Sequence, residues 1–103
     1  MLMAMKTQFD IVLSMKTPKG FADYGQFYVG SERDAAYSLF GQLKGSDLPD
    51  DHAVLHVDLV ETENGVPVGI KSKSCTLDEL GWNCKQVARE VFRLRTIKEA
   101  TDG

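Results

Sequence analysis

His56 and Asp58 are the residues whose types and spacing come closest to a catalytic pair. They lie two residues apart in a segment of alternating hydrophobicity, so both side chains are expected on one side of a strand. A carboxylate beside an imidazole could hold it as a general base or share a metal ion with it, and Tyr24 or Tyr28 could then serve as the acid. The chain has no nucleophile elbow, no HExxH motif and no third ligand that would support this chemistry. We therefore expect the pair to be structural, and we assign no catalytic residue.

Other potential metal ligands and nucleophiles also have structural explanations. Residues 50–52, Asp-Asp-His, are adjacent in sequence, and adjacent side chains rarely converge on one ion, so we interpret them as a solvated loop. Cys75 and Cys84 are nine residues apart, a spacing that fits neither a CxxC redox pair nor a zinc site. The glycines lack the spacing of a phosphate-binding loop. The sequence thus predicts two free thiols, no metal and no cofactor.

The elements that must position these residues follow from the hydrophobic pattern. Ser31, with Asp34 three residues later, predicts the start of a helix that ends near Gly45. Thr76, with Glu79, predicts the start of a longer amphipathic helix. A Pro-Lys-Gly turn joins the first two predicted strands, and an Asn-Gly turn joins the last two. The strands are the four segments that alternate between apolar and polar residues: 8–16, 21–29, 53–61 and 66–74.

The order of these elements predicts an α+β fold, a two-layer ββαββα sandwich. We expect one four-stranded antiparallel sheet, in the order 2-1-3-4, with both helices on one face; the order 1-2-3-4 is the alternative. The two ββα units, at about 6–45 and 53–100, suggest an internal duplication. We expect residues 6–103 to form a single domain and residues 1–5 to be a disordered or loosely attached N-terminus.

Alternation also predicts which side chains lie on the sheet face that the helices leave uncovered. Val12, Val54 and Val60 give this face apolar area, as an interface between two copies would need. Its aromatic and lysine side chains could instead stack bases and hold phosphates, or bind a small molecule. The simplest interpretation is a solvated outer face, which is ordinary for an open antiparallel sheet. The candidate ligand-binding residues on this face are Tyr24, Tyr28, His56, Asp58, Lys71 and Lys73.

In the second strand, the pattern is less regular than in the first. Phe21 is expected on the helix-covered face, together with Phe27 and Val29. Asp23 and Gly25 interrupt that face and suggest a β-bulge.

Two aromatic residues lie off the apolar stripe of the long helix. We expect Trp82 and Phe92 to pack against the first helix. The alternative is an exposed patch rimmed by Arg89 and Arg93, which would suit a binding partner.

Charge and composition restrict the class of protein further. The 103-residue chain has 12 Lys and Arg against 15 Asp and Glu, a net charge of −3. It therefore lacks the basic field that attracts nucleic acid or an anionic membrane surface. No apolar stretch reaches the length of a membrane span, and the N-terminal residues do not resemble a secretory signal. We expect a cytoplasmic protein that has neither a membrane nor nucleic acid as its partner.

Three functional hypotheses follow, in order of preference. The first is a non-enzymatic interaction domain that homodimerises. The alternative is a module that binds a small molecule or nucleic acid on the open sheet face, through Tyr24, Tyr28, His56 and Lys71. The third is an enzyme centred on His56 and Asp58.

Overall fold

The computed structural model describes residues 7–47 and 53–102, with residues 94–102 described by their helical backbone only. The segment 1–5, expected to be loosely attached, and the Asp-Asp-His loop at 50–52 lie outside the described residues.

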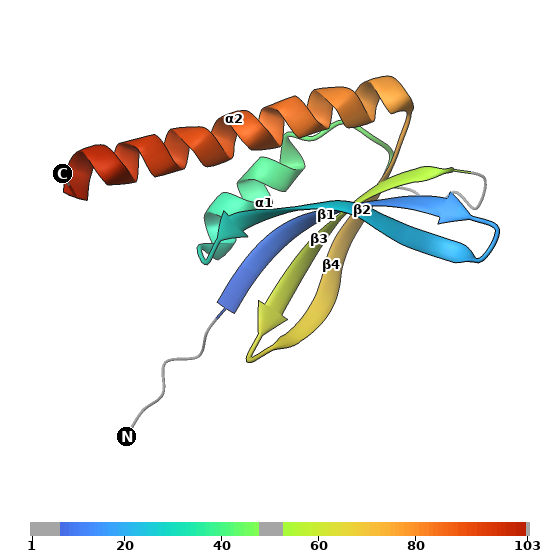
Figure 1. The fold of residues 1–103 in the computed structure, drawn as a ribbon, viewed down its shortest axis with the longest axis horizontal. Coiled ribbons are helices and arrows are strands. Elements are labelled where there is room, and N and C mark those ends of the chain that lie inside the picture. Colours follow the sequence, from blue (N-terminus) through green and yellow to red (C-terminus); the bar gives the residue numbers. More distant parts are fainter. Residues whose placement is uncertain (1–6, 48–52, 103) are drawn as a thin grey trace.

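Six elements follow one another in the predicted order, two ββα units in succession (Figure 1). Each unit is a hairpin of two long strands followed by a helix. The elements are β1 (Thr7–Thr17), β2 (Gly20–Gly30), α1 (Arg33–Gly41), β3 (Leu55–Glu63), β4 (Val66–Cys75) and α2 (Leu77–Asp102).

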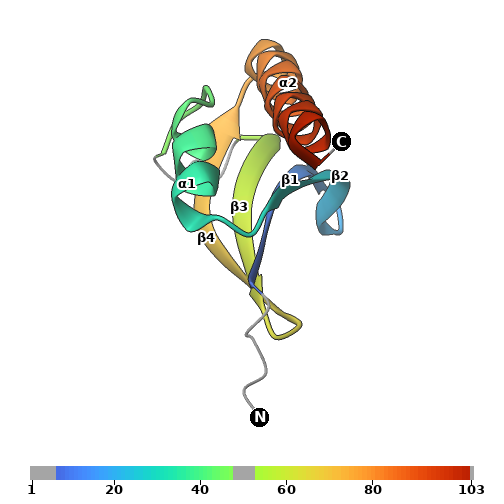
Figure 2. The same ribbon diagram turned by 90° about the vertical axis from the view of Figure 1, so that its left-hand side faces the viewer.

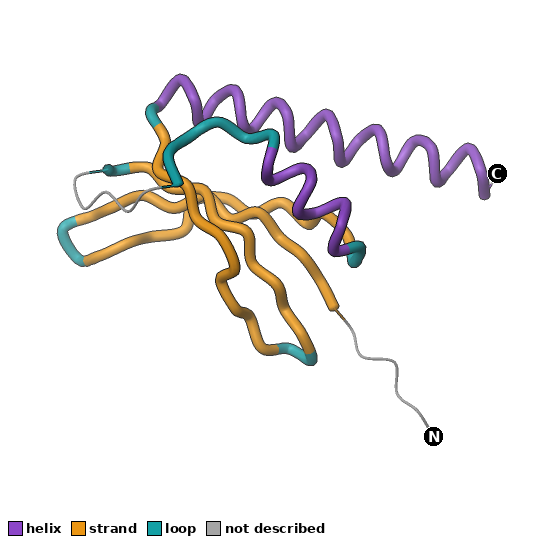
Figure 3. Tube along the Cα trace, turned by 180° about the vertical axis from the view of Figure 1, so that it is seen from behind, coloured by secondary structure: helices purple, strands orange, loops and turns teal. Residues whose placement is uncertain are grey.

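The four strands form a single antiparallel sheet in the order β2-β1-β3-β4, which confirms the predicted order. The connection through α1 carries the chain from β2 across β1 to β3, so β1 and β3 become the central pair. Both helices lie on the same side of the sheet, α1 toward β4 and α2 toward β1 and β2 (Figure 2). Seen from behind, the second half of α2 continues past the strands (Figure 3). The proposed duplication stays a prediction.

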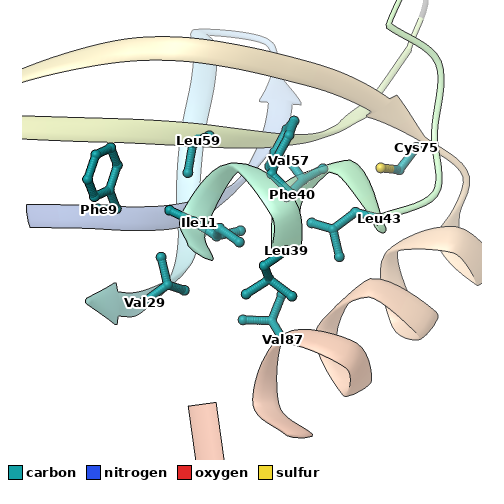
Figure 4. Packing of buried hydrophobic residues seen from close by; sticks show 11 residues of the cluster. Phe9, Ile11, Val29, Leu39, Phe40, Leu43, Val57, Leu59, Cys75 and Val87 are labelled. Carbon is teal, nitrogen blue, oxygen red and sulfur yellow. The ribbon is translucent and has the colours of Figure 1, made fainter. Parts of the chain in front are cut away.

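The core fills the space between the sheet and the two helices (Figure 4). The central strands contribute Phe9, Ile11, Val57 and Leu59, none of which is exposed. They alternate along β1 and β3, as the sequence pattern requires of strands with one covered face. The helices and their neighbours add the remaining buried apolar side chains: Val29, Ala36, Leu39, Phe40, Leu43, Cys75 and Val87.

One of the two predicted helix caps is present. Thr76 Oγ1 accepts from the Glu79 N–H, and Glu79 Oε1 accepts from the Thr76 N–H, a complete capping box at the start of α2. The box predicted at Ser31 is wrong, because α1 starts two residues later and its N-cap, Glu32, makes no side-chain hydrogen bond. The helix also ends at Gly41, before the predicted stop at Gly45.

Register shifts in the ladders decide which side chains share a face. Opposite Ser14 and Leu13 of β1 lie Asp23 and Gly25, so Tyr24 is an extra residue in β2. In the same way, Ile70 is an extra residue in β4. Each β-bulge moves the side chains beyond it to the other face, because the alternation slips by one residue.

These bulges correct three predicted placements. Phe21 pairs with Lys16 and lies on the face away from the helices, not on the covered face. Lys71 and Lys73 pair with Leu59 and Val57, which are core residues, so both lysines lie on the helix-covered face and not on the open one.

Candidate functional site

The sheet face opposite the helices, the outer face, is the first candidate site. Cross-strand partners place its residues in rows across the sheet. One row runs from Gln26 through Val12 and Asp58 to Ser72. The next row holds Asp23, Ser14, His56 and Ser74.

His56 and Asp58 lie on this face as predicted, yet they do not form a catalytic pair. Both are described, and no hydrogen bond or ion pair joins them. Instead, the Phe21 ring meets the His56 ring edge-on, with the ring centroids 4.7 Å apart. The Nε2 atom of His56 is buried and has no hydrogen-bond partner among the described residues. The carboxylate therefore neither orients this imidazole nor takes its proton, which leaves the enzyme hypothesis without its central contact.

Asp10 is a buried carboxylate that sequence reasoning missed. Only 3% of it is exposed although it lies on the outer face, on the central strand β1. Its Oδ2 accepts a hydrogen bond from Gln8 Nε2 at 2.9 Å, while its Oδ1 is buried without a partner among the described residues. An isolated alternating strand gives no signal for this burial, because it arises from the side chains of the strands on both sides.

The two candidate tyrosines lie on β2, at the edge of the sheet and away from His56. Tyr28 pairs with Asp10, whereas His56 pairs with Ser14, four residues or about 13 Å further along β1. Tyr24 is the bulged residue and has no partner on β1 in the ladder. The sequence-predicted set is thus spread over the sheet, and its members do not converge on one ligand.

Lys73 was predicted to bind a ligand on the outer face, but it is buried on the helix side of the sheet. It is 8% exposed, and its Nζ donates to the backbone oxygens of Phe40 and Leu43 at 3.1 and 2.8 Å. The ammonium also lies 5.1 Å from the centre of the Phe40 ring. The end of a helix leaves carbonyl groups without partners; this lysine satisfies the Leu43 oxygen and adds a second donor to the Phe40 oxygen, which also accepts from the Leu43 N–H. Lys71, which is exposed, places its Nζ 5.1 Å from the centre of the Tyr37 ring.

A buried polar cluster next to Lys73 ties α2 to the segment after α1. Asn83 is 1% exposed; its Oδ1 accepts from the Lys44 N–H at 2.7 Å, and its Nδ2 donates to the Lys44 oxygen at 2.8 Å. The Cys75 thiol lies beside it, 3.4 Å from the same oxygen. Burial, and then the nearby Glu79 carboxylate, raise the pKa of the Cys75 thiol, and burial also raises that of Cys84. Raised pKa values make both thiols poor nucleophiles at neutral pH.

The described residues hold few other features that could bind a ligand. Within 7–47 and 53–93, where side chains are described, no three His, Cys, Asp or Glu side chains gather where one metal ion could bind them. Among the helices described, none combines the length and the apolar character needed to cross a membrane.

Trp82 and Phe92, the two aromatic residues of α2, differ in their surroundings. Trp82 is about one-third exposed, and Lys44 Nζ lies 4.4 Å from the centre of its ring. Phe92 is 70% exposed, so the prediction that it packs against the first helix is wrong. The Tyr37 ring of α1 packs edge-on against Phe9.

Comparison with known proteins adds no functional information. No protein-family model matches the chain, and the searches of curated proteins and of solved structures found no match.

Proposed function

We propose that this protein is a non-enzymatic interaction domain that works as a homodimer. One observation carries the proposal: large exposed apolar side chains concentrate on the sheet. Nine large hydrophobic side chains are exposed among those the structure describes, and four of them belong to β2 and to the residue before β3: Phe21, Tyr24, Tyr28 and Val54. Exposed apolar surface of this kind is typical of interaction sites, because water leaves it when a partner binds.

The absence of a bond between His56 and Asp58, both described, favours this function over catalysis. Charge favours a protein partner over nucleic acid. Lys71 and Lys73 lie on the helix side of the sheet. Of the charged strand residues discussed above, the outer face therefore carries one lysine, Lys16, and two exposed or half-buried carboxylates, Asp23 and Asp58. Such a face repels phosphates more than it attracts them.

Binding of a small molecule on the outer face is the second candidate, and it rests on the unpartnered Asp10 Oδ1 and His56 Nε2 atoms. Both atoms are closed to solvent, so a ligand would have to displace the side chains that cover them. Tyr28, the cross-strand partner of Asp10, and Gln8, which donates to the Asp10 Oδ2 atom, are its neighbours. A cytoplasmic location also belongs to the proposal, since Cys75 and Cys84 are both free thiols.

Sedimentation equilibrium tests the homodimer over about 1 to 100 µM, the range in which interfaces of modest size assemble. We expect the mass to rise with concentration to twice the chain mass of 11.4 kDa. A single species of 11.4 kDa at every concentration would refute the proposal.

A further inference from the structure

Strand β2 is an edge of the sheet that no described strand covers. It is eleven residues long and pairs with β1 alone among the described strands. Three of its side chains, Phe21, Tyr24 and Tyr28, are between 49% and 62% exposed. It has neither proline nor lysine, the residues with which proteins commonly protect such edges. Its outward N–H and C=O groups can therefore pair with another strand.

The opposite edge, β4, is less open to pairing. Pro67 lacks the N–H that a ladder needs. At the other end of the strand, Ser74 exchanges two backbone hydrogen bonds of 2.9 Å with Ser46, so part of this edge is already paired.

The bulges in β2 leave one stretch suitable for pairing at its centre. Gly25–Tyr28 stays in unbroken register with β1, between the extra residues Tyr24 and Val29. Gln26 is exposed at the middle of this stretch and points to the outer face with its partner Val12.

Helix α2 extends the apolar surface above this edge. Glu90 of α2 and Leu39 of α1 line the same small cavity, so Glu90 marks the side of α2 that faces α1. Successive helical residues are about 100° apart, so Phe92 lies about 200° and Leu77 about 140° around the helix from Glu90. Both therefore face away from α1, and α2 itself lies on the β2 side of the helix layer (Figure 2). They are 70% and 73% exposed.

A second copy of the chain is the partner that fits this surface. β2 carries one charged residue, Asp23. It therefore lacks the cluster of charges that would select a charged partner, and two copies of the strand repel each other little. Self-pairing of one strand is antiparallel about a two-fold axis, which also sets the two α2 helices side by side. The exposed aromatic and leucine side chains on β2 and α2 together present about 600 Å² of accessible surface per copy, without the backbone of β2. A stable interface buries about 800 Å² of surface on each partner.

We propose that two copies join β2 to β2 beside Gln26, forming one eight-stranded sheet whose junction is covered by the apolar sides of the two α2 helices. This inference rests on the homodimer proposed above and specifies its interface.

Matched substitutions on the two edge strands test the interface. Gln26→Lys places like charges beside each other at the two-fold axis, and Ser72→Lys makes a comparable change in the same outer-face row on β4. We expect Q26K to raise the dimer dissociation constant at least about tenfold, as like charges directly opposed in a ladder should, and S72K to leave it within about twofold. Equal weakening by both variants, or weakening by S72K alone, would overturn the inference and leave the homodimer standing.

Charge reversal controls for misfolding of the variant. Q26E alone should weaken the dimer as Q26K does, whereas an equimolar mixture of Q26K and Q26E should restore a dimer of one copy of each, because opposite charges then face each other. A mixture that stays monomeric would overturn the inference.

Amide hydrogen exchange reads the backbone pairing directly. In the wild-type chain, N–H groups within Gly25–Tyr28 should become protected as the concentration rises through the dissociation constant, because only strand pairing gives them new acceptors. A dimer that forms without this protection associates through another surface, which would refute the edge pairing but not the homodimer. A wild-type chain that never dimerises would refute both.

Discussion

Replacement of the buried lysine, Lys73→Met, tests whether the ammonium holds the end of α1 to β4. Methionine keeps the apolar stem and most of the volume, so the change removes the charge and its two hydrogen bonds and leaves little cavity. Phe40 O keeps a donor, the Leu43 N–H at 3.1 Å, whereas Leu43 O loses the Nζ donor at 2.8 Å.

The expected loss follows from that one uncompensated acceptor. A buried carbonyl left without its partner costs about 1–3 kcal/mol. The hydrogen bonds from a charged donor add to this loss, while methionine no longer needs the desolvation of an ammonium, which offsets part of it. We expect K73M to lower the free energy of unfolding by about 2 kcal/mol, and the Tm by about 10 °C for a domain of this size.

Urea unfolding followed by circular dichroism measures the change, with the slope of the transition checked for constancy. Lys71→Met is the matched control, because it lies on the same strand and face but is exposed and contacts only the Tyr37 ring in the described structure. We expect K71M to cost about 0.5 kcal/mol. If K73M is as stable as K71M, or more stable than the wild type, desolvation outweighs the two hydrogen bonds and the reasoning is wrong.

The remaining predictions concern caps, polar clusters and ion pairs. Asn83→Ala should lower the free energy of unfolding by about 3 kcal/mol in urea titrations, because both backbone groups of Lys44 lose their partner; a loss below about 1 kcal/mol would contradict this. Thr76→Ala should cost about 1 kcal/mol by the same assay and leave the fold unchanged, and an unaltered stability would show that the capping box contributes nothing. Because the pKa of Cys75 is raised, the folded state keeps a proton that the unfolded chain loses, so the free energy of unfolding should fall as the pH rises above about 8.5 and stay level near pH 7. Thermal unfolding at these pH values checks the direction of the change. In Cys75→Ala, the decrease in stability above about pH 8.5 should be smaller. Arg33→Ala, which breaks an exposed ion pair with Glu61, should change the free energy of unfolding by less than about 1 kcal/mol.

Much of the fold could be predicted from local patterns. The alternation of β1 and β3 predicted their buried residues, because these strands run without an extra residue and keep one face toward the helices. Topology followed from the order of the elements, because a helix that joins two hairpins must cross the sheet and leaves few ways to arrange the strands. The Thr76 capping box was predictable because all of its partners lie within four residues.

The predictions failed where a contact depends on residues far apart in the sequence. The bulge at Ile70 moved Lys71 and Lys73 to the helix side, and there Lys73 met the carbonyl groups of α1. A lysine in a strand is normally interpreted as solvated, and no local signal says that its acceptors lie 30 and 33 residues away. Phe21 changed faces for the same reason, and its new neighbour is His56.

The sequence by itself determined the number, type and order of the elements, the central position of β1 and β3, and the mildly acidic charge. These properties depend on hydrophobic period, on turn residues and on composition, which are local or summed over the chain. The tertiary structure alone decided which side chains share a face beyond each bulge, which polar groups are buried, and that the β4 edge is partly paired through Ser46 and Ser74 whereas β2 pairs with β1 alone among the described strands. An extra residue in a ladder reverses all the side chains that follow it, and whether a polar group is buried depends on neighbours that only the folded chain brings to it.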